Sequence, residues 1–149
     1  MLHIIPLSVT SAHLKLCSNF RTKGRFPSLT FFDKETGCTL WRSSQTKTGL
    51  MASRSIDDEK MLSEIGRMSP NQGDDVKVVI YDARSYINAL ANKVMNGGFE
   101  NTKDYYRDCE LVFCDIDNIH AVRDAINKVY ELGGSTTNQN LLTNQSWLS

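Results

Sequence analysis

Polar side chains suited to ligand recognition follow two apolar, strand-like runs of the sequence. The runs 76–81 (VKVVIY) and 110–114 (ELVFC) are each followed by an aspartate and then by an apolar pattern of helical period. In open α/β sheets, ligands bind where the strands give way to loops. We therefore expect a recognition site at this edge of a sheet, and its candidate residues are Asp82, Arg84, Asn88, Asn92, Asp117, Asn118 and His120.

Two of these candidates, Asn92 and Asn118, share an uncharged amide side chain. In a parallel arrangement both would come from the same edge of the sheet. An amide offers two donors and one acceptor, which suits sugar-type hydroxyls and phosphate oxygens. The residues alone leave an alternative open, in which Asn118 caps the last helix and Asn92 is a surface residue.

The sequence lacks the common catalytic and metal-binding motifs. A phosphatase loop of the Cys-x5-Arg type surrounds a phosphate with backbone amides and an arginine, above a thiolate. The residues six positions after the four cysteines are Lys23, Ser44, Asp115 and His120, and none of them is arginine. There is no GKS or GKT, no G-x-G-x-x-G turn and no G-x-S-x-G elbow, and the three histidines lack metal-ligand spacing. Polar recognition is the chemistry that remains.

Local patterns predict the elements that position these residues. The runs FPSLTFF and TLWRSS bracket DKETG, which predicts a β-hairpin. Ser55, followed by three acidic residues at 57–59, predicts the start of a helix. The core stripe of that helix would be Met61, Leu62, Ile65 and Met68.

Two strand–loop–helix units are predicted after position 75. Val76–Tyr81 is apolar and β-branched, which predicts a central strand buried on both faces. A helix is expected from Ser85, with a stripe that packs on the sheet: Ile87, Leu90, Ala91 and Val94. Asn96-Gly97-Gly98 is expected to end it with a left-handed glycine.

The second unit repeats this pattern. Glu110–Cys114 is the predicted strand, and the apolar positions from Ile119 to Tyr130 predict a helix that Gly133-Gly134 would stop. The polar segment 135–145 is expected to be a loop.

Composition argues against several classes of protein. Among 149 residues, 17 basic and 17 acidic side chains cancel, so no net field draws the chain to nucleic acid. The four cysteines lack zinc-type spacing, which favours reduced thiols and a cytosolic protein. The N-terminal apolar stretch is too short for a signal peptide, and no run reaches the roughly 18 apolar residues of a membrane span. We expect a soluble, single-domain protein.

Residues 1–25 are expected to be a lead-in segment rather than a folded unit. The run FRTKGRF carries Arg21, Lys23 and Arg25. A basic loop of this kind fits either contact with a phosphate or a solvated approach to the first strand, and the second is the simpler interpretation.

Several of these segments, in this order, resemble the phosphatase domain of the myotubularins, which are cysteine-dependent phosphatases of 3-phosphorylated inositol lipids. The resemblance covers roughly residues 20–148. It consists of FRTKGRFPSLTF, WRSSQ with the later Gly49, the acidic start of the 55–68 helix, VIYDARSYINALANK with its Gly-Gly pair, CELVF, DNIHAVRDA and SWLS. The resemblance implies an α/β fold: a partial cysteine-phosphatase-like domain with a central mixed sheet, helices packed on it and an N-terminal β-hairpin. Residues 26–149 would be the incomplete domain.

The resemblance also implies a substrate pocket. The second asparagine of the family motif N-A-x-A-N-K corresponds to Asn92, and the N-I pair of the family motif N-I-H corresponds to Asn118 and Ile119. By this resemblance the three residues contact a phosphoinositide headgroup, such as that of phosphatidylinositol 3-phosphate or 3,5-bisphosphate. No metal or cofactor is implied, and the expected location is the cytoplasm, with peripheral contact at endosomal membranes.

One departure from the family pattern concerns catalysis. The family's nucleophile loop, C-S-D-G-W-D-R, does not occur in these 149 residues. We therefore expect the chain alone to be inactive as a phosphatase. The alternative function is a non-catalytic, pseudophosphatase-like protein that binds an active myotubularin.

Overall fold

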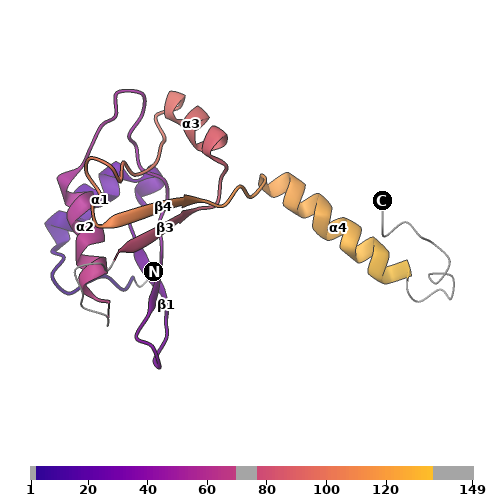
Figure 1. The fold of residues 1–149 in the computed structure, drawn as a ribbon, viewed down its shortest axis with the longest axis horizontal. Coiled ribbons are helices and arrows are strands. Elements are labelled where there is room, and N and C mark those ends of the chain that lie inside the picture. The colour runs from indigo at the N-terminus through magenta and orange to yellow at the C-terminus, as the bar shows by residue number, and fades with distance from the viewer. Residues whose placement is uncertain (1–2, 70–76, 136–149) are drawn as a thin grey trace. The chain divides into compact units, whose positions relative to one another are not determined.

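A computed structural model describes residues 3–69 and 77–135, which form a mixed α/β arrangement with small sheets and four α-helices (Figure 1). Two compact units, residues 1–114 and 115–149, are described separately. The first contains α1 (Ser11–Phe20), the short 3-10 helix η1 (Thr22–Gly24), β1 (Ser28–Phe32), β2 (Thr39–Arg42), α2 (Ile56–Arg67), β3 (Val78–Asp82), α3 (Tyr86–Val94) and β4 (Cys109–Phe113). The second contains α4 (Ile119–Ser135).

The predicted β-hairpin is confirmed. Strands β1 and β2 pair antiparallel, with Ser28 opposite Arg42 and Phe32 opposite Thr39. Its loop is closed by a hydrogen bond from Asp33 N to Cys38 O of 2.9 Å, and Gly37 takes a left-handed φ of 74° that suits glycine.

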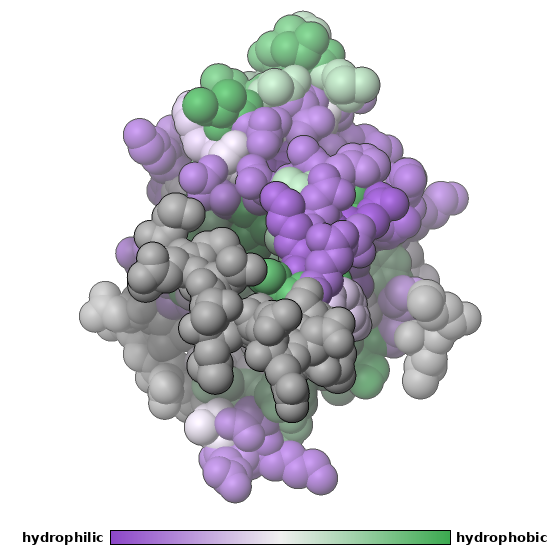
Figure 2. Space-filling model, turned by 90° about the vertical axis from the view of Figure 1, so that its right-hand side faces the viewer, coloured by the Kyte–Doolittle hydropathy of each residue, from purple (hydrophilic) through white to green (hydrophobic). Residues whose placement is uncertain are grey.

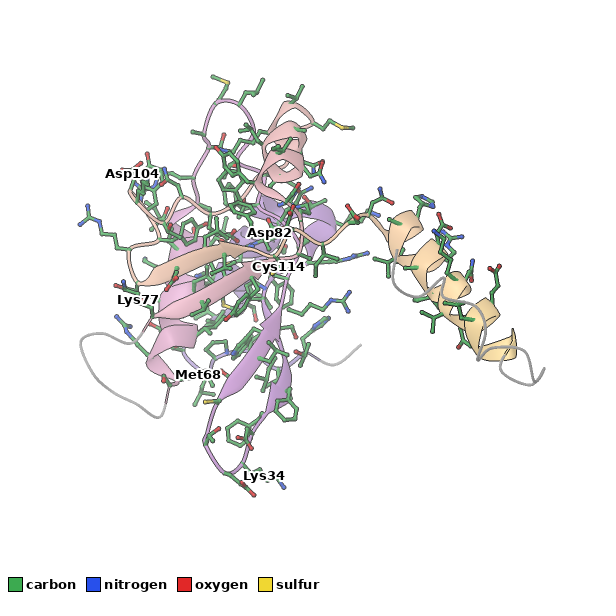
Figure 3. All side chains as sticks on the ribbon, turned by 45° about the vertical axis from the view of Figure 1, so that its right-hand side comes forward. Lys34, Met68, Lys77, Asp82, Asp104 and Cys114 are labelled. Atoms are coloured by element: carbon green, nitrogen blue, oxygen red, sulfur yellow. The ribbon has the colours of Figure 1, made fainter. Side chains whose placement is uncertain are left out.

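The two strands of the strand–loop–helix units pair in parallel, which is the arrangement that places both strand ends at one edge of the sheet. Asp82 lies opposite Phe113 at the end of the register, and Cys114 N donates to Asp82 O at 2.8 Å. Figure 3 shows Asp82 and Cys114 close together at this edge. The loops that follow β3 and β4 therefore begin at the same edge of the sheet.

The prediction of one central mixed sheet is wrong for the described residues, which form two separate two-stranded sheets. The prediction that Val76–Tyr81 is buried on both faces is also wrong, because Val79 and Tyr81 are 42% and 68% exposed. The alternate residues Val78 and Ile80 pack against the core. Burial alternates because side chains of a strand point to opposite faces and the core covers only one of them.

Helix α2 begins where the sequence indicated. The Ser55 side chain accepts a hydrogen bond from Asp58 N and caps the helix. Met61, Leu62 and Ile65 are buried in the core, as predicted, whereas Met68 is 43% exposed at the helix end.

Helix α1 was not predicted, and it lies within the segment expected to be a lead-in. Thr10 caps it by accepting from His13 N, and Cys17 reaches the core with no exposed surface. The segment is short and its amphipathic pattern is weak, and in the structure it packs against α2, a contact that no local pattern predicts.

Helix α3 starts after Ser85 as predicted, but its apolar stripe does not pack on the sheet. Ile87, Leu90 and Val94 are 76%, 45% and 71% exposed, and Ala89 on another face is buried. The helical periodicity was predicted correctly, but no element among residues 3–69 and 77–114 covers this face.

The end of α3 differs from the prediction in one detail. Asn96, rather than a glycine, takes the left-handed conformation, with φ 58°. Gly97 N donates to Asn92 O and Asn96 N donates to Lys93 O, the two bonds of a Schellman motif. Asparagine is the residue that most often replaces glycine at such a position.

Helix α4 runs through Gly133-Gly134 to Ser135, so the predicted stop is wrong. Each glycine costs about 1 kcal/mol relative to alanine within a helix but does not forbid it. The polar loop expected at 135–145 lies outside the described residues, apart from Ser135.

Candidate functional site

A pocket of about 380 Å³ lies at the edge where β3 ends, and Asn92 lines it. The pocket is contained within the first unit and is formed by the segment after β2, the end of β3, the loop that follows β3 and the last turn of α3. Its lining residues include Ser43, Ser44, Gln45, Asp82, Arg84 and Asn92. The structure thus brings Asp82, Arg84 and Asn92 to one place, as the sequence predicted.

Arg84 organises this pocket. Its Nε donates to Asp82 Oδ1 at 2.9 Å, and its two terminal nitrogens donate to Asp82 Oδ2, Gln45 Oε1 and Gly98 O. Asp82 therefore balances the charge of Arg84, and Gln45 joins this pair to the loop after α3. The guanidinium is held in a fixed orientation at the pocket wall.

Asn92 is half-buried in the second turn of α3. Its amide nitrogen donates to Asn88 O at 3.0 Å, one helical turn earlier. This bond fixes the side chain along the helix at the pocket edge, where its carbonyl oxygen and second amide hydrogen are the groups available to a ligand.

Asn118 caps α4. Its side-chain oxygen accepts from His120 N at 2.9 Å and from Ala121 N at 3.3 Å. The alternative in which Asn118 caps the last helix is therefore correct. The cap uses only the oxygen of the amide. Ile119 is the first residue of α4 and is 69% exposed.

The three predicted site residues belong to different units. Asn92 lies in the first, and Asn118 and Ile119 lie in the second. That all three line one pocket stays a prediction.

Beneath the Asn92 pocket lies a buried ionic cluster centred on Arg21. Arg21 is 1% exposed and ion-paired with Asp58 and Glu100, each at 2.6 Å. Burial by itself lowers the pKa of Arg21, but Glu100 and Asp58 outweigh that effect and raise the pKa above its usual value. Arg21 stays charged and is engaged by carboxylates. Neither sequence interpretation of this residue, phosphate contact or solvated lead-in, is correct.

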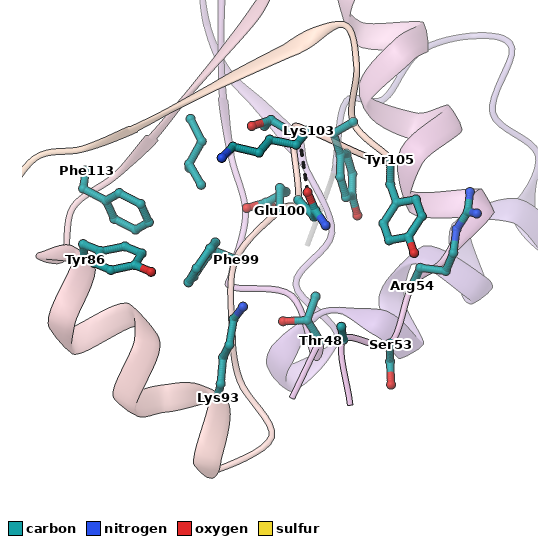
Figure 4. Close-up of a pocket in the computed structure, with 15 residues that line it drawn as sticks. Thr48, Ser53, Arg54, Tyr86, Lys93, Phe99, Glu100, Lys103, Tyr105 and Phe113 are labelled. Carbon is teal, nitrogen blue, oxygen red and sulfur yellow. Dashed lines mark hydrogen bonds between the residues drawn. The ribbon is translucent and has the colours of Figure 1, made fainter. Parts of the chain in front are cut away.

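Sequence reasoning missed a second pocket, of about 420 Å³, on the other side of α3 (Figure 4). Three cationic side chains line it, Arg54, Lys93 and Lys103. Phe99 and Phe113 form its apolar wall, with ring centroids 5.3 Å apart and planes at 90°. Lys93 directly follows Asn92 in the motif NALANK, which was the signal available in the sequence.

Lys93 Nζ lies 4.1 Å from the centroid of the Phe99 ring. Arg54 lies 4.2 Å over the ring of Tyr105 and also pairs with Glu59 at 2.7 Å. The charge of Arg54 is therefore balanced by Glu59, whereas the contact of Lys93 is with an aromatic face.

The thiols of the first unit's core are unsuited to nucleophilic catalysis. Burial, followed by the charge of Asp58, raises the pKa of Cys17 to about 12, and burial followed by Glu100 does the same for Cys109. All four cysteines are free thiols. Within residues 3–69 and 77–135, no group of three His, Cys, Asp or Glu side chains could hold a metal ion.

The described helices are too short or too polar to cross a membrane.

Comparison with known proteins defines the class first. The family model of the myotubularin-like phosphatase domain matches residues 1–149. The chain belongs to the myotubularin-like phosphatase family.

Individual relatives agree with this assignment. The chain is 40% identical over 129 residues to phosphatidylinositol-3,5-bisphosphate 3-phosphatase MTMR2 of Bos taurus, covering 87% of this chain and 19% of that protein. It is 38% identical over 145 residues to phosphatidylinositol-3,5-bisphosphate 3-phosphatase MTMR3 of Caenorhabditis elegans, covering 94% and 14%. It is 40% identical over 128 residues to phosphatidylinositol-3-phosphatase myotubularin-1 of Arabidopsis thaliana, covering 85% and 15%. The chain therefore spans about a fifth or less of the length of these relatives.

Proposed function

We propose that this chain supplies a headgroup-contacting wall of a phosphoinositide 3-phosphatase. The observation that carries the proposal is the Asn92 pocket: an amide at the pocket edge, beside a guanidinium held by Asp82 and Gln45, in a chain of this family. Amide and guanidinium donors suit inositol hydroxyls and phosphate oxygens. Asn118 and Ile119 complete the proposed contact set.

These 149 residues are proposed to recognise but not to hydrolyse. A cysteine-dependent phosphatase forms a cysteinyl-phosphate intermediate by thiolate attack, with an arginine holding the phosphate oxygens. No Cys-x5-Arg sequence occurs here, and the buried thiols of Cys17 and Cys109 stay protonated. Losing the nucleophile of such an enzyme costs many orders of magnitude in rate. Measurable phosphate release from 3-phosphorylated inositol lipid vesicles by the purified chain would contradict this.

Headgroup recognition is tested with the isotope-labelled full chain and inositol 1,3-bisphosphate as the soluble probe. We expect the side-chain amide resonances of Asn92 and Asn118 to shift saturably, and to shift much less with inositol 1-phosphate. Asn92→Ala should weaken the binding at least fivefold. Asn118→Asp keeps the capping oxygen but adds a charge that repels phosphate, so it should weaken binding while α4 stays capped. Saturable binding that is insensitive to both variants would refute the assigned residues.

A second candidate is the non-catalytic partner of an active myotubularin. The exposed apolar stripe of α3, formed by Ile87, Leu90 and Val94, favours it because such a face is normally covered by polypeptide. Specific co-purification with an active myotubularin, abolished by Ile87→Asp, would support this candidate. A chain that remains monomeric in the presence of that enzyme would exclude it.

A further inference from the structure

The loop between β2 and α2 and the C-terminal end of α3 form an apolar tip on the first unit. The tip, defined by Leu50, Met51 and Met95, has side chains that are 72%, 93% and 83% exposed. Figure 2 shows apolar residues gathered at the top of the molecule, the end at which this loop and the end of α3 lie in Figure 1. Single exposed apolar residues are ordinary, whereas three large ones on two joined segments form a surface that needs an explanation.

The two segments of the tip are fixed to each other. Gly49 N donates to Gly97 O at 2.9 Å, and Ser53 N closes the loop by donating to Thr48 O at 2.8 Å. The Thr48 side chain packs so closely on Gly98 that a Cβ there would lie 1.8 Å from Thr48 Oγ1. The tip is therefore a preformed protrusion.

Positively charged residues occur in both of the segments that carry the tip. Segments 45–54 and 84–99 contain two lysines and two arginines but no acidic residue, in a chain whose total charge is zero. Glu59 and Asp82 balance the arginines. Lys47 Nζ donates to a backbone carbonyl and Lys93 Nζ faces an aromatic ring, so these two contacts leave both charges in place.

We propose that the tip inserts into the interfacial layer of an anionic phospholipid bilayer. In such a layer, apolar side chains reach about 5–10 Å into the headgroup and acyl boundary while lysines remain at the level of the phosphates. The tip combines the same two features, exposed apolar side chains and the nearby lysines Lys47 and Lys93.

Insertion would also orient the Asn92 pocket. Met95 follows Asn92 by three residues, about 4.5 Å along the helix axis. Gln45 Oε1 accepts from both Gly98 N and Arg84, which joins the tip to the pocket wall. An inserted tip therefore holds the pocket at headgroup level. This orientation rests on the proposed function, whereas insertion of the tip does not.

The test uses the full chain and vesicles of phosphatidylcholine and phosphatidylserine in a four-to-one ratio, without phosphoinositide. We expect the chain to sediment with these vesicles and much less with phosphatidylcholine alone. Met51→Asp should lower the partition coefficient at least tenfold, and Met95→Asp should act in the same direction. Leu7→Asp is the matched control, because Leu7 is fully exposed in the first unit but lies outside the tip, and it should change the coefficient less than twofold.

A spectroscopic measurement reports insertion directly. Met51→Trp should show a blue-shifted emission on adding the vesicles, relative to the parent chain, and Leu7→Trp should not. The proposal is overturned if the parent chain does not bind the anionic vesicles, or if Met51→Asp binds as well as Leu7→Asp. It is also overturned if Met51→Asp disperses a dimer of the chain without changing vesicle binding, since the tip would then be a protein contact.

Vesicles that also contain a 3-phosphorylated inositol lipid separate this proposal from the proposed function. If Asn92→Ala retains the extra binding due to that lipid while Met51→Asp loses vesicle binding, the headgroup assignment is wrong and the tip assignment stands. If Asn92→Ala removes the extra binding and Met51→Asp does not weaken vesicle binding, the headgroup assignment stands and the tip assignment is wrong.

Discussion

Arg21 and Asp58 form a two-pronged ion pair that joins the end of α1 to the first turn of α2. Arg21 Nε donates to Asp58 Oδ1 at 2.8 Å and Nη2 to Asp58 Oδ2 at 2.6 Å. Arg21 also donates to Ser44 O at 2.9 Å, next to the residue that fixes Arg84 in the Asn92 pocket. This buried pair therefore supports the pocket from beneath.

Removing the arginine of this pair should destabilise the first unit strongly. Arg21→Met leaves the Asp58 and Glu100 carboxylates buried without their cation, which typically costs about 3–5 kcal/mol of unfolding free energy. Arg67→Ala is the control, because its pair with Glu64 is solvent-exposed and contributes about 0–1 kcal/mol. Chemical denaturation of the full chain measures both. Equal losses from the two variants would show that the buried pair has no special role.

Tyr106→Phe tests a neighbouring contact in the same cluster. The Tyr106 hydroxyl donates to Asp58 Oδ2 at 2.8 Å, and burial together with the Asp58 charge raises the pKa of Tyr106. Loss of a hydrogen bond to a buried charge should cost about 1.5–3 kcal/mol. A double-mutant cycle with Asp58→Asn, followed by denaturation, should show coupling. Simple additivity would contradict the bond.

Gly98→Ala should be destabilising because the added Cβ meets Thr48 Oγ1 at 1.8 Å. Relieving such an overlap requires the buried Thr48 side chain to rotate or its segment to move away from Gly98, which costs about 1–3 kcal/mol. Thr48→Ala removes the clashing oxygen and should recover part of the loss in the double variant. Thermal unfolding measures the series, and a Gly98→Ala variant as stable as the parent would refute the close approach.

Stability should fall as pH rises from about 9 toward 12. The folded-state pKa of Cys17 and of Cys109 is about 12, against 9.0 for the exposed thiol, so only the unfolded chain loses these protons in that range. The contribution of these raised pKa values to the free energy of unfolding is complete below pH 9. Above pH 9 it is lost at about 1.4 kcal/mol per pH unit for each thiol. Denaturation at several pH values should show a smaller slope for Cys17→Ala than for Cys38→Ala, whose thiol is exposed. Equal slopes would contradict the shift.

The cap of α4 gives a prediction confined to the second unit. Asn118→Ala removes the acceptor for His120 N and Ala121 N and should cost about 0.5–2 kcal/mol of helix stability. Asn118→Asp should retain the cap. Amide hydrogen exchange in the first turn of α4 distinguishes them, and equal protection in both variants would show that the cap is not stabilising.

Local sequence signals determined several elements in advance. The cap at Ser55, the start of a helix at Ser85 and the β-hairpin around Gly37 were all predicted and are confirmed. These features depend on capping, turn chemistry and periodicity, which act over a few residues. The family resemblance was also carried by sequence alone, since its motifs are linear and ordered.

Only the tertiary structure shows which helix faces are buried and which charged side chains are paired. Periodicity predicted the apolar stripe that includes Ile87 and Val94, but only the fold shows that these side chains are exposed in the part of the first unit that the structure describes. Arg21 looked like a surface cation because its partners, Asp58 and Glu100, lie 37 and 79 residues away in the chain. Sequence patterns report local conformation and composition, whereas burial and ion pairing depend on contacts between distant segments, which no local pattern encodes.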